Sequence, residues 1–326
     1  MPNAIGGYFE IELPEGRSYF HDKALLYQSA RAAFRALVKE IKPNRFFVPN
    51  FICDSMISSL EAENIKYVFY DLDKSFNVPN SITIENGDLL LYVNYYGVCQ
   101  AQVDRLLETY PPRQLVFDFA HAFFEPPKLQ ALATIYSPRK FFGLPDGGML
   151  VTSAKIAPPN IQDSGSLARM SHLLKRLCED PEVGYRDYIQ AESSLKNSEP
   201  KSMSNITRRL LISINCEKAR IKRAENFLHM HSYLKIINKI SIDTTKLKSP
   251  LCYPLATDIK NLREYLISNR IFIPTYWKDA SKRVTSDWNE TIIKGIIPIP
   301  IDQRYNKNDL SRIISLVLDA TNGIKK

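Results

Sequence analysis

The sequence predicts an α/β protein with a mostly parallel sheet covered by helices on both faces, followed by a smaller α+β domain. In the first half of the 326 residues, short apolar runs alternate with segments of helical periodicity, which is typical of parallel sheets. Polar residues follow several apolar runs, as they do at the carboxyl edge of such sheets, where ligands gather. The second half is more charged and more helical. The chain is long enough for two domains.

The first half supplies the strands of the sheet and the helices that cover it. Apolar residues at helical spacing predict helices, and the apolar run over 88–93 is of the kind that a buried parallel strand shows. In chain order we expect a helix over 23–37, a strand over 45–48 ended by Pro49, a helix over 55–62, strands over 66–70 and 88–93, a helix over 101–110 and a strand over 114–117.

The second half predicts a linker and then the smaller domain. Residues 163–201 are polar, charged and poorly periodic, which favours an irregular excursion. Beyond it we expect a long helix over 205–234, strands over 251–254 and 271–273, and helices over 259–268 and 309–320. The expected domains are therefore 15–200, which is large, and 201–326, which is small. Residues 1–14 could join the small domain by adding a strand over 6–13.

Composition excludes several classes of protein. The net charge is +8, and basic residues are densest between Lys196 and Lys239, but no nucleic-acid motif or interleaved aromatic pattern accompanies them. We therefore expect a solvated face, or an approach for an anionic small substrate. No run nears the roughly 18 apolar residues of a membrane span. The N-terminus lacks the pattern of a signal peptide, and the five cysteines are dispersed, so we expect a cytoplasmic protein.

Common catalytic motifs are missing from the chain. There is no GxxxxGK[ST], GxGxxG, GxSxG or HExxH, so neither a P-loop, a dinucleotide fingerprint, a serine-hydrolase elbow nor a zinc-protease helix is predicted. His229 and His231 fall on opposite sides of a helix, which is poor geometry for one metal ion. We expect no metal site.

One acid and one lysine indicate a different chemistry. Asp118 ends the apolar run that begins at Leu115, and Lys140 follows in a compact turn between another apolar run and the pair Gly147-Gly148. Pyridoxal phosphate needs a lysine that binds it covalently and an acid that keeps its pyridine nitrogen protonated, so that the ring can accept electrons. The combination of Asp118 and Lys140 therefore favours this cofactor, although either residue alone could be structural.

Several further segments match one enzyme family. The chain resembles the sugar-nucleotide aminotransferases of the DegT/StrS type, which are fold type I enzymes dependent on pyridoxal phosphate. The resemblance runs, in patches, over nearly the whole length. It is carried by residues 28–33 (QSARAA), 48–53 (VPNFIC), 118–121 (DFAH) and 136–148, with weaker similarity at 223–226 and 299–305.

The resemblance implies a role for each matching residue. Lys140 would be the catalytic lysine, and Asp118 would pair with the pyridine nitrogen. His121 would lie near the ring and its phenolic oxygen, and Phe51 would stack on the ring. Ser29, Ala30 and Arg31 would form the turn beneath the phosphate, to which Ser137 would offer a hydroxyl.

The implied function is the transfer of an amino group, from glutamate, to a keto-sugar linked to a nucleotide, in the synthesis of surface polysaccharides or related sugars. The family also implies a homodimer. Two alternatives stay open. One is a dehydratase acting on a deoxy-sugar, against which Lys140 argues, because that branch has His in its place. The other is a non-catalytic binding or scaffold protein, since Ala30 replaces a Gly, Ile135 replaces a phosphate-binding Ser, and the chain is short.

Overall fold

A seven-stranded sheet forms the larger part of the molecule. The computed structural model describes residues 5–16, 18–196, 199–283 and 295–321. The strand order is β1-β7-β6-β5-β4-β2-β3; β2 to β6 run parallel, while β7 is antiparallel to both its neighbours. The strands are β1 (Leu25–Tyr27), β2 (Arg45–Pro49), β3 (Tyr67–Tyr70), β4 (Asp88–Val93), β5 (Leu115–Asp118), β6 (Ala133–Tyr136) and β7 (Gly148–Thr152).

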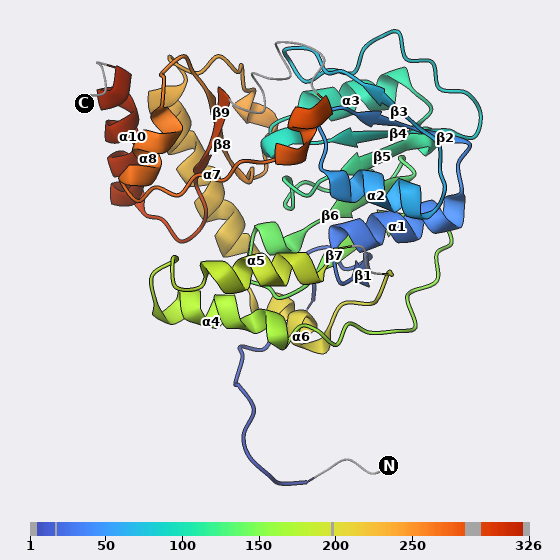
Figure 1. The fold of residues 1–326 in the computed structure, drawn as a ribbon, viewed down its shortest axis with the longest axis horizontal. Helices are drawn as coiled ribbons and strands as arrows, with labels where there is room; N and C mark the ends of the chain where they lie inside the picture. Colours follow the sequence, from blue (N-terminus) through green and yellow to red (C-terminus); the bar gives the residue numbers. More distant parts are fainter. Residues whose placement is uncertain (1–4, 17, 197–198, 284–294, 322–326) are drawn as a thin grey trace.

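Helices cover both faces of this sheet, which confirms the predicted fold class. Figure 1 shows α3 (Gln100–Thr109) on one side and α1 (Ala30–Ile41) with α2 (Asp54–Ala62) on the other. Every residue of β4 and β5 is buried, as expected of strands covered on both faces. The expected strands and helices between residues 45 and 117 all form, with ends within a residue or so of the prediction.

The first helix begins later than the sequence predicts. Leu25–Tyr27 was assigned to a helix over 23–37 but forms β1, which pairs with β7. The helix starts where the Ser29 hydroxyl accepts a hydrogen bond from Ala32 N at 3.1 Å, a standard N-cap. It ends at Lys42, whose left-handed backbone (φ 46°) lets its N–H bond to Val38 O. An apolar side of this helix, which includes Phe34 and Leu37, packs on the sheet.

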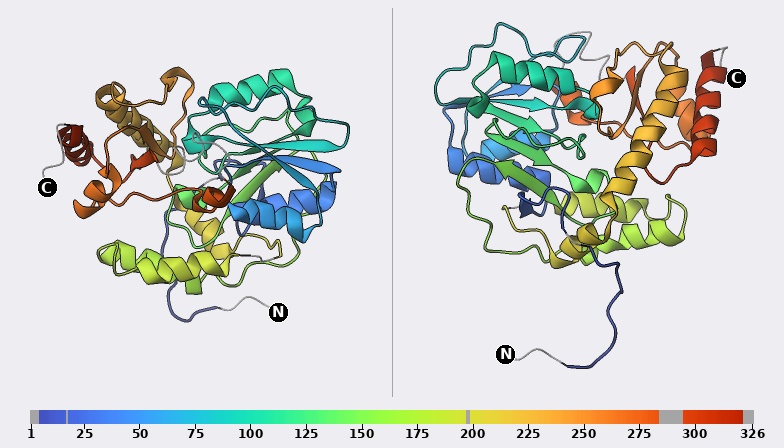
Figure 2. Two further views of the ribbon diagram at one scale, coloured as in Figure 1. Left: turned by 45° about the horizontal axis from the view of Figure 1, so that its top comes forward. Right: turned by 180° about the vertical axis from the view of Figure 1, so that it is seen from behind.

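A second, smaller sheet lies beside the first, as Figures 1 and 2 show. It pairs β8 (Cys252–Ala256) with β9 (Ile296–Pro300) and is surrounded by α7 (Cys216–Leu234), α8 (Leu262–Ser268) and α10 (Lys307–Thr321). These elements share a hydrophobic cluster of their own, separate from the cluster around the large sheet. The domain boundary near residue 200 stays a prediction.

The structure corrects several predictions for the second half. The expected linker over 163–201 contains two helices, α4 (Ser171–Cys178) and α5 (Tyr185–Ser194). The single helix expected over 205–234 is two, α6 (Asn205–Ser213) and α7, because Asn215 caps a new helix by accepting a hydrogen bond from Lys218 N. Residues 271–273 form no strand; β9 supplies the partner of β8 instead.

The N-terminal segment does not form the expected strand over 6–13. Its described residues, 5–16, extend away from the body of the protein in all three views of Figures 1 and 2. Ile5, Tyr8 and Phe9 are almost fully exposed. Glu10 pairs with Arg209 of α6 at 2.9 Å. Among the described helices, none is both long and apolar enough to cross a membrane.

Candidate active site at the carboxyl edge of the sheet

The carboxyl edge of the sheet brings together the residues that the sequence singled out. Asp118 is the last residue of β5, and Lys140 ends the short helix η3 (Pro138–Lys140) that follows β6. Phe51 lies just beyond the end of β2, and His121 lies one turn beyond Asp118. Because β2, β5 and β6 are parallel, their carboxyl ends meet at one edge, where side chains from distant parts of the chain become neighbours.

Lys140 and His121 are in direct contact, and Asp118 lies near enough to Lys140 for their charges to interact; we call these three side chains the cluster. Lys140 Nζ lies 2.7 Å from His121 Nε2 and 5.4 Å from the centre of the Tyr276 ring. Asp118 is buried, and its carboxylate accepts one hydrogen bond, from Ala120 N at 2.8 Å. The second carboxylate oxygen accepts none from the described residues, and His121 Nδ1 is also buried without a partner among them. The cluster therefore has one buried nitrogen without a partner, and one Asp118 oxygen that can accept a further hydrogen bond.

The surroundings shift the pKa of each group in the cluster. Packing around the Lys140 amine lowers its pKa, although the residue as a whole is exposed to solvent. Burial, and then the charge of Lys140, lowers the pKa of His121 well below its usual value, so its imidazole is neutral. Burial raises the pKa of Asp118, against the opposing effects of Ala120 N–H and Lys140. A cation placed beside such a buried carboxylate would stabilise its ionised form.

The N-terminus of α1 lies against the loop that follows Lys140. Gly147 N donates to Gln28 O at 2.7 Å. A Cβ on Gly148 would lie only 2.0 Å from Ser29 C and 2.3 Å from Ala30 N, so only glycine allows this close approach. The free N–H groups and the dipole at the start of a helix attract an anion. The two glycines thus hold an anion-binding helix end next to the lysine loop.

The structure shows the surroundings of the residues at which the chain departs from the pattern of the family it resembles. Ala30 does not have a left-handed backbone, so the loss of a glycine there causes no φ strain. Ile135 is buried inside β6 and offers no hydroxyl. Ser137 is buried directly before η3, and its hydroxyl makes no capping hydrogen bond to that helix. Among these three residues, Ser137 is the one with a hydroxyl beside the lysine.

Two arginines add positive charge near the start of α1. Arg31 donates to Leu195 O at 3.0 Å, and Arg139 pairs with Glu192 of α5. Burial and then the proximity of Arg139 lower the pKa of Arg31, which indicates that the two guanidinium groups lie close together. Arg139 Nε is buried without a partner among the described residues. Glu192 balances the charge of Arg139, so the guanidinium of Arg31 is the charge that this end of the site offers to an anion.

Phe51 is packed among aromatic rings, one of which the sequence analysis missed. Its ring centre lies 5.2 Å from that of Tyr95, nearly parallel to it, and 4.7 Å from that of Trp277. Trp277 also lies 4.6 Å from the His121 ring, as does Tyr276. Both residues follow α8, in the small domain. The sequence signal was an adjacent Tyr-Trp pair in an otherwise polar segment, whose place in the fold no local pattern reveals.

A buried arginine connects the small domain to the lysine loop. Arg223 of α7 donates to Leu251 O at 3.1 Å and to Phe141 O at 3.4 Å, and burial lowers its pKa to about 10. Its Nε donates to Gln303 Oε1 at 2.7 Å, and Gln303 in turn donates to Phe141 O at 3.0 Å. The two segments of weaker family similarity, 223–226 and 299–305, therefore meet directly beside the residue after Lys140.

The residues present fit pyridoxal phosphate. A ring nitrogen carrying a proton would supply the donor that the second Asp118 oxygen lacks, and a ring oxygen would supply the partner that His121 Nδ1 lacks. The phosphate would bind at the start of α1, near Arg31 and Ser137. Lys140, with its lowered pKa, is the amine that would hold the cofactor.

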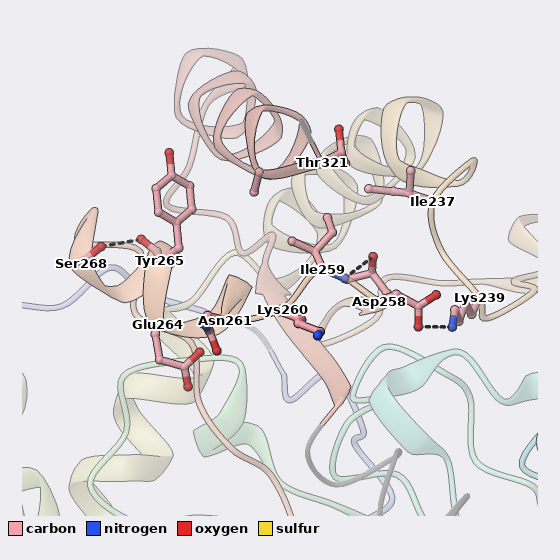
Figure 3. Close-up of a pocket in the computed structure, with 12 residues that line it drawn as sticks. Ile237, Lys239, Asp258, Ile259, Lys260, Asn261, Glu264, Tyr265, Ser268 and Thr321 are labelled. Carbon is pink, nitrogen blue, oxygen red and sulfur yellow. Dashed lines mark hydrogen bonds and ion pairs between the residues drawn. The ribbon is translucent and has the colours of Figure 1, made fainter. Parts of the chain in front are cut away.

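The small domain contains a hollow that shares no residue with this cluster. It has a volume of about 910 Å³ and lies between α8, the end of α10 and the segment after α7. Figure 3 shows Lys239 paired with Asp258 on its wall, and Tyr265 across from them. Within the described ranges, no group of three or more His, Cys, Asp or Glu residues could hold a metal ion. The sheet edge therefore remains the candidate active site.

The fold is that of known sugar aminotransferases. No family model matches the sequence, and no curated protein matches it. Among solved structures, the PLP form of Spr1654 from Streptococcus pneumoniae is 15% identical, with a TM-score of 0.65 over 93% of this chain and 88% of that chain. Helicobacter pylori PseC, an aminotransferase of pseudoaminic acid biosynthesis, is 18% identical, with a TM-score of 0.62 over 92% and 87%.

A third solved structure gives the same result. DesV from S. venezuelae, solved with a ketimine intermediate, is 16% identical, with a TM-score of 0.65 over 93% of this chain and 85% of that chain. Matches at such low identity establish the fold. The chain therefore has the fold of the sugar aminotransferases, as its resemblance to fold type I enzymes implied.

Proposed function

We propose that this protein is a pyridoxal-phosphate-dependent aminotransferase that moves an amino group, from glutamate, to a keto-sugar linked to a nucleotide. The observation that carries the proposal is the cluster of Lys140, His121 and buried Asp118 at the carboxyl edge of the sheet. The similar solved structures include PseC of pseudoaminic acid biosynthesis and the PLP form of Spr1654. By analogy, we expect a role in the synthesis of surface polysaccharides or related sugars, in the cytoplasm.

Each side chain of the cluster would have its own role in the reaction. When bound, the cofactor supplies an electron sink that stabilises negative charge on the substrate carbon. Lys140 Nζ, whose pKa is lowered by desolvation, would carry the proton between that carbon and the cofactor. Neutral His121 accepts a hydrogen bond from Lys140 through Nε2 and so orients the amine. Asp118 would keep the ring nitrogen protonated, through a contact that its burial would strengthen.

The distribution of charge suits an anionic substrate. Arg31 places positive charge beside the start of α1, which the cofactor phosphate would use, while Arg139 is paired with Glu192. The stretch from 196 to 239, which the sequence marked as basic, is only partly surface, because Arg223 is buried and binds carbonyl groups. Exposed members such as Lys218 remain available to attract a nucleotide by long-range steering.

We also propose that the protein is a homodimer. Apolar side chains are exposed on α4 and α5 and on the N-terminal segment, more densely than single scattered surface residues would be. They are Leu174, Leu177, Val183, Tyr185, Tyr188 and Ile189 on or between the two helices, and Ile5, Tyr8, Phe9 and Ile11 on the segment. Light scattering after size exclusion measures the mass directly, and a monomer at micromolar concentration would refute this part of the proposal.

The decisive experiment is spectroscopic. The purified protein is mixed with pyridoxal phosphate beside a Lys140→Ala variant, and the near-visible spectrum is recorded. We expect a yellow band in the wild type only, trapped on Lys140 by borohydride and bleached by glutamate. A band that glutamate leaves unchanged would exclude glutamate as the donor. No band in the wild type would refute the enzyme and leave a binding or scaffold protein.

A further inference from the structure

A segment of the small domain crosses to the sheet edge and inserts two aromatic rings there. We call residues 274–283 the strap. At its start, Arg263 of α8 donates to Pro274 O at 2.7 Å. At its end, Arg283 donates to Asn50 O at 3.3 Å and pairs with Asp54 of α2. The strap is therefore attached to both domains, and the stretch between the two attachments lies over the candidate active site.

Trp277 is the most deeply inserted residue of the strap. It is 8% exposed, and its ring lies within 5.6 Å of five others, those of Phe51, Tyr95, Tyr96, His121 and Tyr276. Its contacts with Phe51 and His121 are the shortest, at 4.7 Å and 4.6 Å. These are the two rings expected to contact the cofactor.

The backbone of Trp277 is also unusual. Its φ of 51° lies in the left-handed region, which bulky residues rarely adopt and which persists only where the surroundings enforce it. The carbonyl of Trp277 accepts a hydrogen bond from Ala280 N at 2.9 Å, which closes a tight turn. The strained backbone and the packed indole hold each other in place. Loss of the ring contacts would therefore also release the strained turn.

Resting on the proposed function, we propose that the Trp277 indole competes with the cofactor ring for the same faces of Phe51 and His121, so that binding of the cofactor displaces Trp277. An aromatic ring packs at 4.5–7 Å, centre to centre, from its neighbours, and Trp277 already takes this distance from both rings. The indole is tilted against them, at 49° to Phe51 and 35° to His121, and a further ring placed on that side of either would need the space that the indole fills. The strap attachments at Arg263 and Arg283 do not involve the indole, so the strap can stay attached while the indole moves.

Competition has a measurable consequence for affinity. A ligand whose site is open in only a fraction of molecules binds more weakly by that fraction. If the indole fills the site in about nine of ten molecules, its removal tightens binding of pyridoxal phosphate about tenfold. A residue that merely supported the site would have the opposite effect, because its loss would weaken binding.

The first measurement compares three proteins: wild type, Trp277→Leu and Phe227→Leu. Phe227 is the matched control, since it is also a buried aromatic residue, 1% exposed, that packs on Tyr253 within the small-domain cluster. The dissociation constant of pyridoxal phosphate is measured by titration. We expect it to fall about tenfold in Trp277→Leu and to stay at the wild-type value in Phe227→Leu. An unchanged or weaker affinity in Trp277→Leu alone would overturn the inference.

The second measurement observes the indole itself and needs no change at position 277. The sequence contains a second tryptophan, Trp288, which lies outside the described residues; Trp288→Phe leaves one reporter. In protein labelled with 5-fluorotryptophan, the fluorine resonance of Trp277 should move towards the position of the free amino acid as the cofactor is added. A resonance that stays in place while borohydride traps the cofactor on Lys140 would overturn the inference alone. Failure to trap any cofactor would overturn the proposed function as well.

Discussion

Replacing Gly148 by alanine should separate the lysine loop from the start of α1. The new Cβ would lie 2.0 Å from Ser29 C, 2.2 Å from Ser29 O and 2.3 Å from Ala30 N, whereas real Cβ atoms keep at least 3.0 Å from such atoms. The two backbones must therefore move apart by about 1 Å. All three clashing atoms are backbone, so no rotamer change can relieve the contact. Overpacking of this kind costs about 1–3 kcal/mol, and we expect the upper end of that range.

The displacement should also reduce cofactor binding and activity. A shift of about 1 Å in groups that position a reactant can cost about 100-fold in rate. The control is Gly143→Ala, because a Cβ there would meet only Leu173 Cδ2 at 3.5 Å, an ordinary contact. Denaturant unfolding and titration with pyridoxal phosphate are compared for both variants. If Gly148→Ala unfolds within about 0.5 kcal/mol of Gly143→Ala, the size expected of a neutral substitution, the reasoning fails.

Three further predictions follow from buried ionisable side chains. Asp118→Asn should abolish cofactor binding but stabilise the protein without cofactor at pH 7, because burial raises the pKa of Asp118 and the ionised form disfavours folding above that pKa. Burial lowers the pKa of His21 from 6.5 to about 4, so protonation favours the unfolded chain. Stability should therefore fall by up to about 3 kcal/mol between pH 6.5 and pH 4, and His21→Gln should remove this loss. Arg223→Met should cost about 3 kcal/mol, because its hydrogen bonds to carbonyl groups are lost, whereas Lys218→Met on the exposed side of the same helix should change little.

Unfolding midpoints across a pH series check all three. A midpoint for Asp118→Asn below that of the wild type at pH 7, without cofactor, would contradict the cost assigned to the buried carboxylate. Equal pH profiles for His21→Gln and the wild type would show that another group controls the acid limb. If Arg223→Met and Lys218→Met lost the same stability, the connection through Phe141 O would contribute nothing.

Sequence reasoning identified correctly those elements whose burial produces a recognisable run or periodicity of apolar residues. The strand over 88–93 is buried at every residue, so its apolar run was unambiguous. β1 was missed because three apolar residues before a capped helix continue the helical pattern; only pairing with β7 makes them a strand. α4 and α5 were missed because much of their apolar surface is exposed, which leaves weak periodicity.

The candidate site shows the same division. The places of Asp118 at the end of one strand and of Lys140 just after another could be predicted, because the end of each strand is visible in the sequence. The family resemblance added His121 and Phe51, and the roles of all four residues stay predictions. The contacts of Trp277 could not be predicted, because Phe51 and His121 belong to the large domain and lie far from it in the sequence. Its position depends on how α8 and the large sheet pack together, which a single sequence does not encode locally.

The connection between Arg223 and the lysine loop limits how this protein can be recombined. Under the proposed function, an exchange of small domains between such enzymes would be one way to change the acceptor sugar. Here a transplanted small domain must bring a donor for Phe141 O, one residue after Lys140, and a match for Gln303. A graft that respects the domain boundary but omits this pair would leave a buried carbonyl unsatisfied beside Lys140. The unit of exchange is therefore the small domain together with the residues that follow Lys140.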